Sequence, residues 1–104
     1  MNERWKLAWV HALRSGDYVP SEYGLHTEAG AFSALGVLID IAVDGWWIWD
    51  PGEHRYEYED HTIAVPDSVL ADVGLDRANE RRIAVMQHDR RTFDQIADWI
   101  ENNV

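Results

Sequence analysis

Apolar residues recur at helical spacing near both ends of the chain. Between residues 3 and 14 they form one stripe at i, i+3, i+4, i+7 and i+8, made of Trp5, Ala8, Trp9, Ala12 and Leu13. A second stripe runs through residues 93–103, after Thr92 and Gln95, which have the spacing of a capping box. Both segments are therefore predicted to be amphipathic helices, with Asn2 as the N-cap of the first.

A third segment, residues 31–43, is apolar on most of a helical circumference, so it is predicted to be a buried helix. At about 100° per residue its small and polar positions fall within about 80° of one another, and they form a narrow seam of Ser33, Gly36, Asp40 and Asp44. Gly36 costs about 1 kcal/mol in a helix relative to alanine, which predicts close backbone packing there. A buried carboxylate needs a donor. For Asp40 we expect a loop backbone or Arg14, with a functional acid as the alternative.

Residues 46–65 alternate between apolar and polar in the manner of short antiparallel strands. The run Asp50-Pro51-Gly52-Glu53 has proline and glycine where a type II turn places them, and Glu59-Asp60 predicts a second turn. The resulting meander puts Tyr56 opposite Trp47 on one side and opposite Ile63 on the other. One face is then core, with Trp47, Trp49, His54, Tyr56, Tyr58, His61, Ile63 and Val65. The opposite face includes Trp46, Ile48, Arg55 and Glu57.

Two further helices are predicted, one from Pro66 to about Val73, closed by Gly74, and one over residues 79–88. Residues 17–30 show no clear period and are predicted to be an ordered loop with one short strand. No repeat or linker divides the 104 residues. The predicted fold is a single α+β domain over residues 1–104, with four to five helices packed on a small three-stranded antiparallel β-meander.

The charge balance limits the partners that this chain can bind. It carries 19 acidic and 9 basic residues, for a formal net charge of −10. This disfavours a nucleic-acid backbone and an anionic membrane surface, and it suits a basic protein partner. The chain has no cysteine, and its longest apolar run is broken by Asp40 and Asp44 and is too short to span a bilayer. We expect a cytoplasmic protein.

Catalytic and metal-binding patterns are weak in this sequence. The histidines His54 and His61 lie near Glu57, Glu59 and Asp60, but the predicted register separates the two imidazoles by about 13 Å, at about 3.3 Å per residue. No serine lies in a strand-turn-helix elbow that would make it a nucleophile. We therefore predict no catalytic residue, no metal and no cofactor.

Several short blocks resemble a family of small uncharacterised proteins of bacteriophages and prophages, frequently those of actinobacteria. The blocks are Trp9 with residues 12–16 and Tyr18, Phe32 with Leu35-Gly36-Val37-Leu38 and Asp40, Val65-Pro66, Gly74-Leu75, and Phe93 with residues 96–101. Relatives often have cysteine where this chain has Ser33, Ala34 and Ile39, which argues against a thiol role here. The resemblance implies phage origin and action in the host bacterial cytoplasm, but no activity.

These observations favour an accessory protein of phage origin that acts without catalysis, by binding a host or phage protein. The expected interaction surface is Trp46, Ile48, Arg55 and Glu57. One alternative is an acidic DNA mimic that inhibits a nucleic-acid-binding protein, with carboxylates such as Glu53, Glu57, Glu59, Asp60 and Asp67 in one ridge. Another is a small enzyme or ligand-binding domain with a pocket near Asp40. A homodimer built on the Trp46 face is a further alternative.

Overall fold

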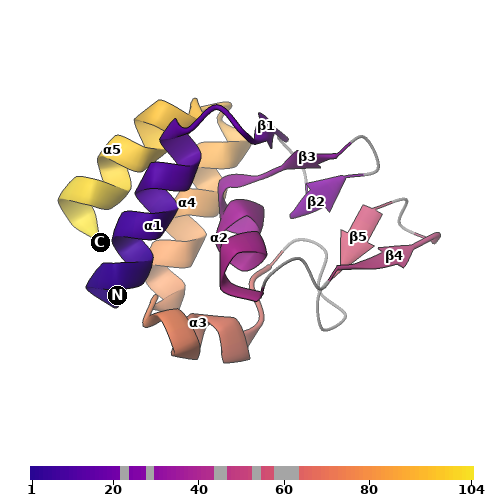
Figure 1. Ribbon diagram of the computed structural model, residues 1–104, viewed down its shortest axis with the longest axis horizontal. Coiled ribbons are helices and arrows are strands. Elements are labelled where there is room, and N and C mark those ends of the chain that lie inside the picture. Colours follow the sequence, from indigo (N-terminus) through magenta and orange to yellow (C-terminus); the bar gives the residue numbers. More distant parts are fainter. Residues whose placement is uncertain (22–23, 28–29, 44–46, 53–54, 58–63) are drawn as a thin grey trace.

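The computed structural model describes residues 1–21, 24–27, 30–43, 47–52, 55–57 and 64–104. This part of the chain forms the helices α1 (Glu3–Arg14), α2 (Ala34–Val43), α3 (Asp67–Val73), α4 (Arg77–His88) and α5 (Phe93–Asn103). The strands are β1 (Val19–Pro20), β2 (His26–Thr27), β3 (Ala31–Phe32), β4 (Ile48–Asp50) and β5 (Arg55–Glu57). Helices gather at one end of the molecule and strands at the other, with α2 between them (Figure 1). The α+β class and the helix number are as predicted.

Helix α1 has the predicted bounds and the predicted cap. The Asn2 side chain accepts hydrogen bonds from the backbone N–H groups of Arg4 at 2.9 Å and Trp5 at 3.4 Å. Trp9 is fully buried, and its indole N–H donates to the carbonyl of Ala34 at 2.8 Å. This bond joins α1 to the start of α2, while the opposite side of α1 packs on α5.

Helix α2 begins three residues later than predicted, because Ala31 and Phe32 form β3 instead. The Ser33 hydroxyl accepts a hydrogen bond from the backbone N–H of Gly36 at 3.0 Å, which satisfies one of the free donors of the first turn. Residues 34–39 are all buried. Gly36 lies against the backbone of Leu25, since a Cβ at residue 36 would stand 1.8 Å from the Leu25 carbonyl oxygen.

The sheet is mixed, which corrects the predicted antiparallel meander. Its strand order is β1-β3-β2-β5-β4, with β1 and β3 parallel and the remaining pairs antiparallel. The neighbour of β5 is β2, from the segment predicted to be mainly a loop, and not the predicted strand that ends at Val65. Val65 is buried outside any strand, and residues 58–63 lie outside the described residues. A strand of two residues is too short to show a period in sequence.

The β4–β5 hairpin exists, but its register differs from the prediction by two residues. Trp49 is paired with Tyr56 and Asp50 with Arg55, so that four residues connect the strands. The Asp50 carboxylate accepts a hydrogen bond from the backbone N–H of Gly52 at 2.9 Å, which makes a local turn that the type II prediction did not include. A shift of two residues keeps every side chain on its predicted face of the sheet.

The three C-terminal helices begin and end at recognisable caps. Helix α3 ends at Gly74 in the left-handed conformation, with φ of 73°. Helix α4 begins at Arg77, two residues before the predicted start, after the N-cap Asp76. The predicted capping box of α5 is present, with Thr92 and Gln95 bonded reciprocally. None of the described helices is long and apolar enough to cross a membrane.

Candidate functional site

A row of rings crosses the sheet from strand to strand. Its members are paired in register, Phe32 with His26, His26 with Tyr56, and Tyr56 with Trp49. The His26 ring is stacked on both neighbours, with centroids 3.9 Å from Phe32 and 4.3 Å from Tyr56. Trp49 meets Tyr56 edge-on at 5.2 Å. We call Phe32, His26, Tyr56 and Trp49 the aromatic row.

Helix α2 is tied to this sheet through Asp40. One carboxylate oxygen accepts a hydrogen bond from the Tyr18 hydroxyl at 2.7 Å, and the other accepts one from the Trp47 indole N–H at 3.0 Å. Both donors also contact the aromatic row, because the Tyr18 ring lies 5.0 Å from Phe32 and the Trp47 ring lies 5.2 Å from His26. The carboxylate therefore orients two aromatic side chains.

The donors to Asp40 differ from the expected ones. Arg14, named as a partner from the sequence, instead pairs with Asp98 at 2.5 Å and Glu101 at 3.1 Å on α5. The reason is geometric: Arg14 ends the helix that packs against α5, whereas Asp40 faces the sheet. The sequence did not indicate the aromatic donors. Tyr18 precedes α2 and Trp47 follows it, and no local pattern places either one beside Asp40.

Burial holds the titratable groups near Asp40 in their neutral forms. The pKa of the His26 imidazole is lowered, chiefly because burial penalises the charged ring, although the nearby carbonyl of Ala31 and the Asp40 charge oppose this. The pKa of the Tyr18 phenol is raised by burial and then by its hydrogen bond to Asp40. Neutral His26 and Tyr18 suit a packing role, since a phenol that donates to a carboxylate stays protonated at neutral pH.

The predicted interaction surface is only partly described. Ile48 is 61% exposed on β4. Arg55 and Glu57 lie in β5, paired with Asp50 and Ile48, and their side chains are outside the description, as is all of Trp46. Trp49, predicted to be core, is 38% exposed, because β4 ends the strand order far from the cover of α2. Trp47 is half-buried against the aromatic row.

The polar seam of α2 faces two different neighbours. Ser33 is 1% exposed and caps the helix, and Gly36 touches the Leu25 backbone just before β2. Asp40 is half-buried and bonds aromatic donors from two segments, and Asp44 lies outside the described residues. The seam thus caps the start of α2, contacts the backbone that leads into β2 and binds two rings that pack on the sheet.

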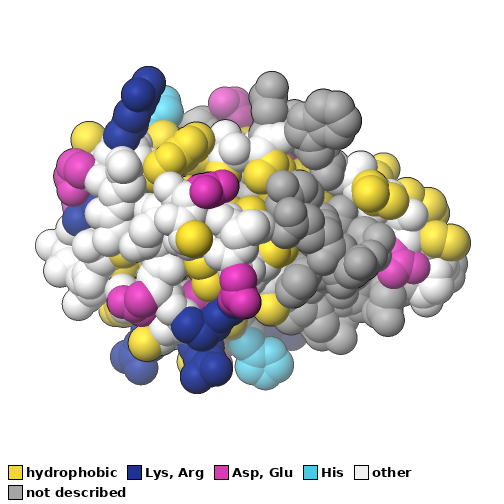
Figure 2. All heavy atoms as spheres, turned by 90° about the horizontal axis from the view of Figure 1, so that it is seen from below, with side chains coloured by type: hydrophobic (Ala, Val, Ile, Leu, Met, Phe, Trp, Pro, Cys, Tyr) yellow, Lys and Arg dark blue, Asp and Glu magenta, His cyan; other side chains and the backbone are white. Residues whose placement is uncertain are grey.

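Charge and exposed apolar surface are distributed unevenly over the molecule. Figure 2 shows hydrophobic side chains at the end that holds β4, while the Lys and Arg side chains drawn in that view lie over the helical part. In the sequence, residues 44–60 include six acidic residues and one basic residue, Arg55. The part of the chain that holds Ile48 and Trp49 is therefore both apolar and acidic in composition.

Metal ligands do not converge in the described part of the chain, where no group of three or more histidine or carboxylate side chains could hold an ion. His54, His61, Glu59 and Asp60, which were weighed as ligands from the sequence, lie outside the described residues. The sequence did not indicate that His26 lies between Phe32 and Tyr56 in the aromatic row, because a lone histidine in an aperiodic segment carries no local signal of its position.

Comparison with known proteins places the whole chain in one family. A family profile described as a domain of unknown function (DUF8296) matches residues 1–104. No curated protein and no solved structure shows significant similarity to the chain. The match spans the helices, the strands and the aromatic row alike. The chain therefore belongs to the DUF8296 family.

Proposed function

We propose that this protein is a phage-encoded accessory protein that acts in the host bacterial cytoplasm by binding a protein partner, without catalysis. The partner's binding surface has an apolar centre with basic residues around it, which complements the apolar and acidic hairpin of this protein. The observation that carries the proposal is the exposure of Ile48 and Trp49 on β4. The phage origin rests on the resemblance of the short sequence blocks described above.

The position of these two side chains supports a binding role. Consecutive residues of a strand point to opposite faces of the sheet, and both Ile48 (61%) and Trp49 (38%) are exposed. The hairpin therefore projects beyond the helical layer, as Figure 1 shows for β4 and β5. Tryptophan is among the residue types most enriched at binding hot spots. The acidic composition of residues 44–60 supports a basic partner.

The test compares variants in which one exposed apolar side chain becomes charged. Ile48→Asp alters the proposed surface, and Leu7→Asp is the matched control, because Leu7 is 58% exposed on α1 at the other end of the molecule. Tagged wild type and both variants are incubated with host lysate, and the captured proteins are quantified by mass spectrometry. We expect Ile48→Asp to lose a partner that wild type and Leu7→Asp retain.

A captured partner is then purified and titrated directly. The affinity should fall as salt is raised, since acidic and basic groups contribute to binding. Trp46→Ala tests the residue of the predicted surface that lies outside the description. Equal capture of every protein by wild type and Ile48→Asp would contradict the surface, and an affinity that does not change with salt would contradict the basic partner.

The homodimer and the DNA mimic stay alternatives. Sedimentation of the free protein at increasing concentration decides the first, because a dimer on this face would be lost in Ile48→Asp and kept in Leu7→Asp. The mimic needs a ridge of free carboxylates, and one of its expected members, Asp67, is ion-paired with Arg77. The side chains of its other expected members, Glu53, Glu57, Glu59 and Asp60, lie outside the described part of the chain.

A further inference from the structure

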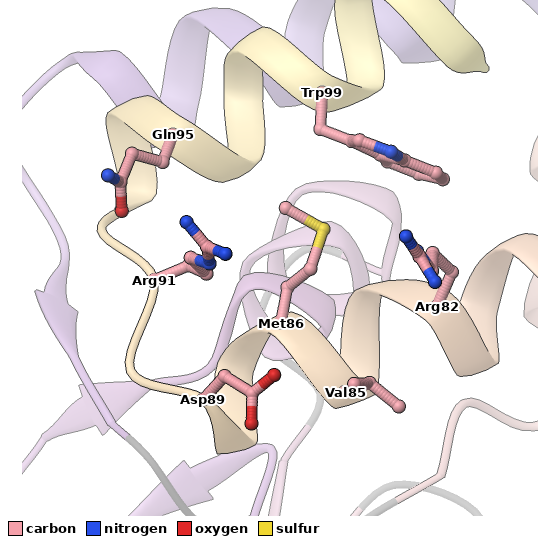
Figure 3. A pocket seen from close by; sticks show the side chains of 7 residues that line it. All are labelled: Arg82, Val85, Met86, Asp89, Arg91, Gln95 and Trp99. Carbon is pink, nitrogen blue, oxygen red and sulfur yellow. The ribbon is translucent and has the colours of Figure 1, made fainter.

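A groove of about 340 Å³ lies between α4 and α5, away from the aromatic row and from β4. Helix α4 lines it with one face through Arg82, Val85 and Met86, and its C-cap Asp89 continues that face at the spacing i+7. Helix α5 contributes Gln95 and Trp99, and Arg91 enters from the turn between the helices (Figure 3). Its volume is at the lower end of that of small-molecule sites.

The groove has an apolar body with cationic groups around it. Val85 is 53% exposed, and Met86 and Trp99 are half-buried. In Figure 3 the Trp99 ring and the Arg82 guanidinium face one another across the groove, and the Arg91 guanidinium points toward the space beside Met86. A ring in this groove would meet apolar atoms on one side and guanidinium donors at its edge.

The two arginines of the groove differ from Arg14 and Arg77 in having no acidic partner among the described residues. Arg14 is paired with Asp98 and Glu101, and Arg77 with Asp67 and Glu80. Arg82 and Arg91 have no such ion pair within the part of the chain that the structure describes. In a chain with a net charge of −10, this groove brings two cationic side chains together beside an indole.

The turn that delivers Arg91 departs from the usual choice of residue. Helix α4 ends in a Schellman motif, with the Arg91 N–H bonded to the Met86 carbonyl at 3.0 Å and the Arg90 N–H to the Gln87 carbonyl at 3.1 Å. The left-handed position of this motif is normally glycine, yet here it is Arg90, with φ of 62°. The equivalent position after α3 is Gly74. A basic residue is thus present at a conformational cost beside the groove.

We infer that the α4–α5 groove binds a small organic acid that carries a planar ring. Arg91 and Arg82 supply charge-assisted hydrogen bonds to its acid group, and the Gln95 amide adds a neutral donor. The ring lies against Trp99 and the side chains of Val85 and Met86. This site is distinct from the proposed protein-binding surface, and either one can fail without the other.

Asp89 lowers the positive charge of the groove and provides a sharp internal test. Its carboxylate lines the same space, and Figure 3 places it on the far side of Met86 from Trp99. A carboxylate within several ångströms repels a bound anion. The inference therefore requires that Asp89→Asn strengthen the binding of an anionic probe, whereas a site for a cation requires the opposite.

The probe for this test is phenyl phosphate, compared with inorganic phosphate and with phenol, and binding is followed by two-dimensional amide NMR. We expect saturable shifts at Arg91, Gln95 and the Trp99 indole N–H with phenyl phosphate, and weaker binding of the two fragments. Arg82→Gln and Arg91→Gln should each lower the affinity about tenfold, the scale of one hydrogen bond to a charged group. Arg81→Gln, exposed on the same helix, should leave it unchanged.

One combination of results supports the site, and two others contradict it. Tighter binding by Asp89→Asn together with loss in Arg82→Gln and Arg91→Gln supports the site. An affinity for inorganic phosphate equal to that for phenyl phosphate overturns the role of Trp99, and unchanged affinity in both glutamine variants overturns the role of the arginines. All of the substituted side chains are exposed, so a matching amide spectrum of each free variant verifies the fold.

Discussion

The helical part and the sheet part of this molecule are held together by different side chains. The helices share a closed aliphatic core. Its most deeply buried members, at most 1% exposed, include Leu35, Leu38, Ile83, Ile96 and Ile100. The sheet has strands of only two or three residues and half-buried rings. Such short strands are not stable by themselves. The sheet therefore depends on α2, which belongs to both parts.

The dependence is concentrated at two positions of α2. Gly36 lets the backbone that leads into β2 approach the helix, and Asp40 accepts hydrogen bonds from two rings that contact the aromatic row. Neither residue adds to the aliphatic core. We therefore expect substitutions on the exposed surface of the sheet to leave the helical core intact, whereas substitutions at Gly36 or Asp40 disturb the contact between the two parts.

Gly36→Ala should have the largest effect on stability. The new methyl group would lie 1.8 Å from the Leu25 carbonyl oxygen, and backbone atoms cannot move aside cheaply. We expect the free energy of unfolding to fall by about 3 kcal/mol or more, at or above the upper end of the range for overpacking. Urea denaturation followed by circular dichroism measures it. Gly30→Ala is the control, because it meets no atom within 4 Å and adds only the strain of its left-handed conformation; equal losses would argue against the close contact.

Leu38→Ala and Trp49→Ala test the two parts directly. Leu38 is fully buried in the helical core, so its truncation should cost about 3 kcal/mol. Trp49 is 38% exposed at the end of the sheet, and its loss should cost about 1 kcal/mol, the scale of one aromatic pair. The same denaturation experiment compares them. A larger loss for Trp49→Ala would mean that the aromatic row, and not the aliphatic core, carries most of the stability.

Asp40→Asn should have an intermediate effect. Asparagine keeps one acceptor but places an amide N–H₂ opposite Tyr18 or Trp47, and the indole N–H cannot accept a hydrogen bond. We expect a loss of about 1–2 kcal/mol, between the values for a hydrogen bond to a neutral group and for one to a charged group. In NMR spectra the Trp47 indole N–H signal should move while the signals of α5 stay in place. A signal of Trp47 that does not move would contradict the carboxylate contact.

A smaller effect should appear on acidification. The pKa of His26 is lowered in the folded protein, so the unfolded chain takes up a proton first, at its ordinary pKa of about 6.5. The contribution of neutral His26 is complete above that pH and is lost as the pH falls below it, toward the folded pKa. Urea midpoints at several pH values should therefore fall more steeply for wild type than for His26→Gln. Parallel curves would show that protonation of His26 does not affect the sheet.

Much of the helical architecture could be predicted from local sequence. The stripe of α1, the cap at Asn2 and the capping box of Thr92 and Gln95 act within a few residues of the chain, so short-range pattern was sufficient. Gly36 was identified in the same way, as a helical glycine in a narrow seam. These features depend only on residues that are close to one another in the sequence.

The sheet could not be predicted in the same way, because its pairing is nonlocal. Strands of two residues have no measurable period, and the partner of β5 came from residues 26–27 instead of from the next segment along the chain. Glu80 likewise has no distinctive pattern in the sequence, yet it is 4% exposed and accepts hydrogen bonds from the Val65 N–H and from Arg77. Both arrangements depend on distant chain segments.

Local spacing and composition were enough to predict the helical segments, the caps at Asn2, Gly74 and Thr92, the acidic balance and the hairpin with its two faces. Three arrangements arise only in the folded molecule: His26 lies at the centre of the aromatic row, Tyr18 and Trp47 donate to Asp40, and Arg82 and Arg91 share a groove with Trp99. These contacts join different elements of the fold, with partners up to 30 residues apart in the sequence, so packing selects among the many partners that composition allows.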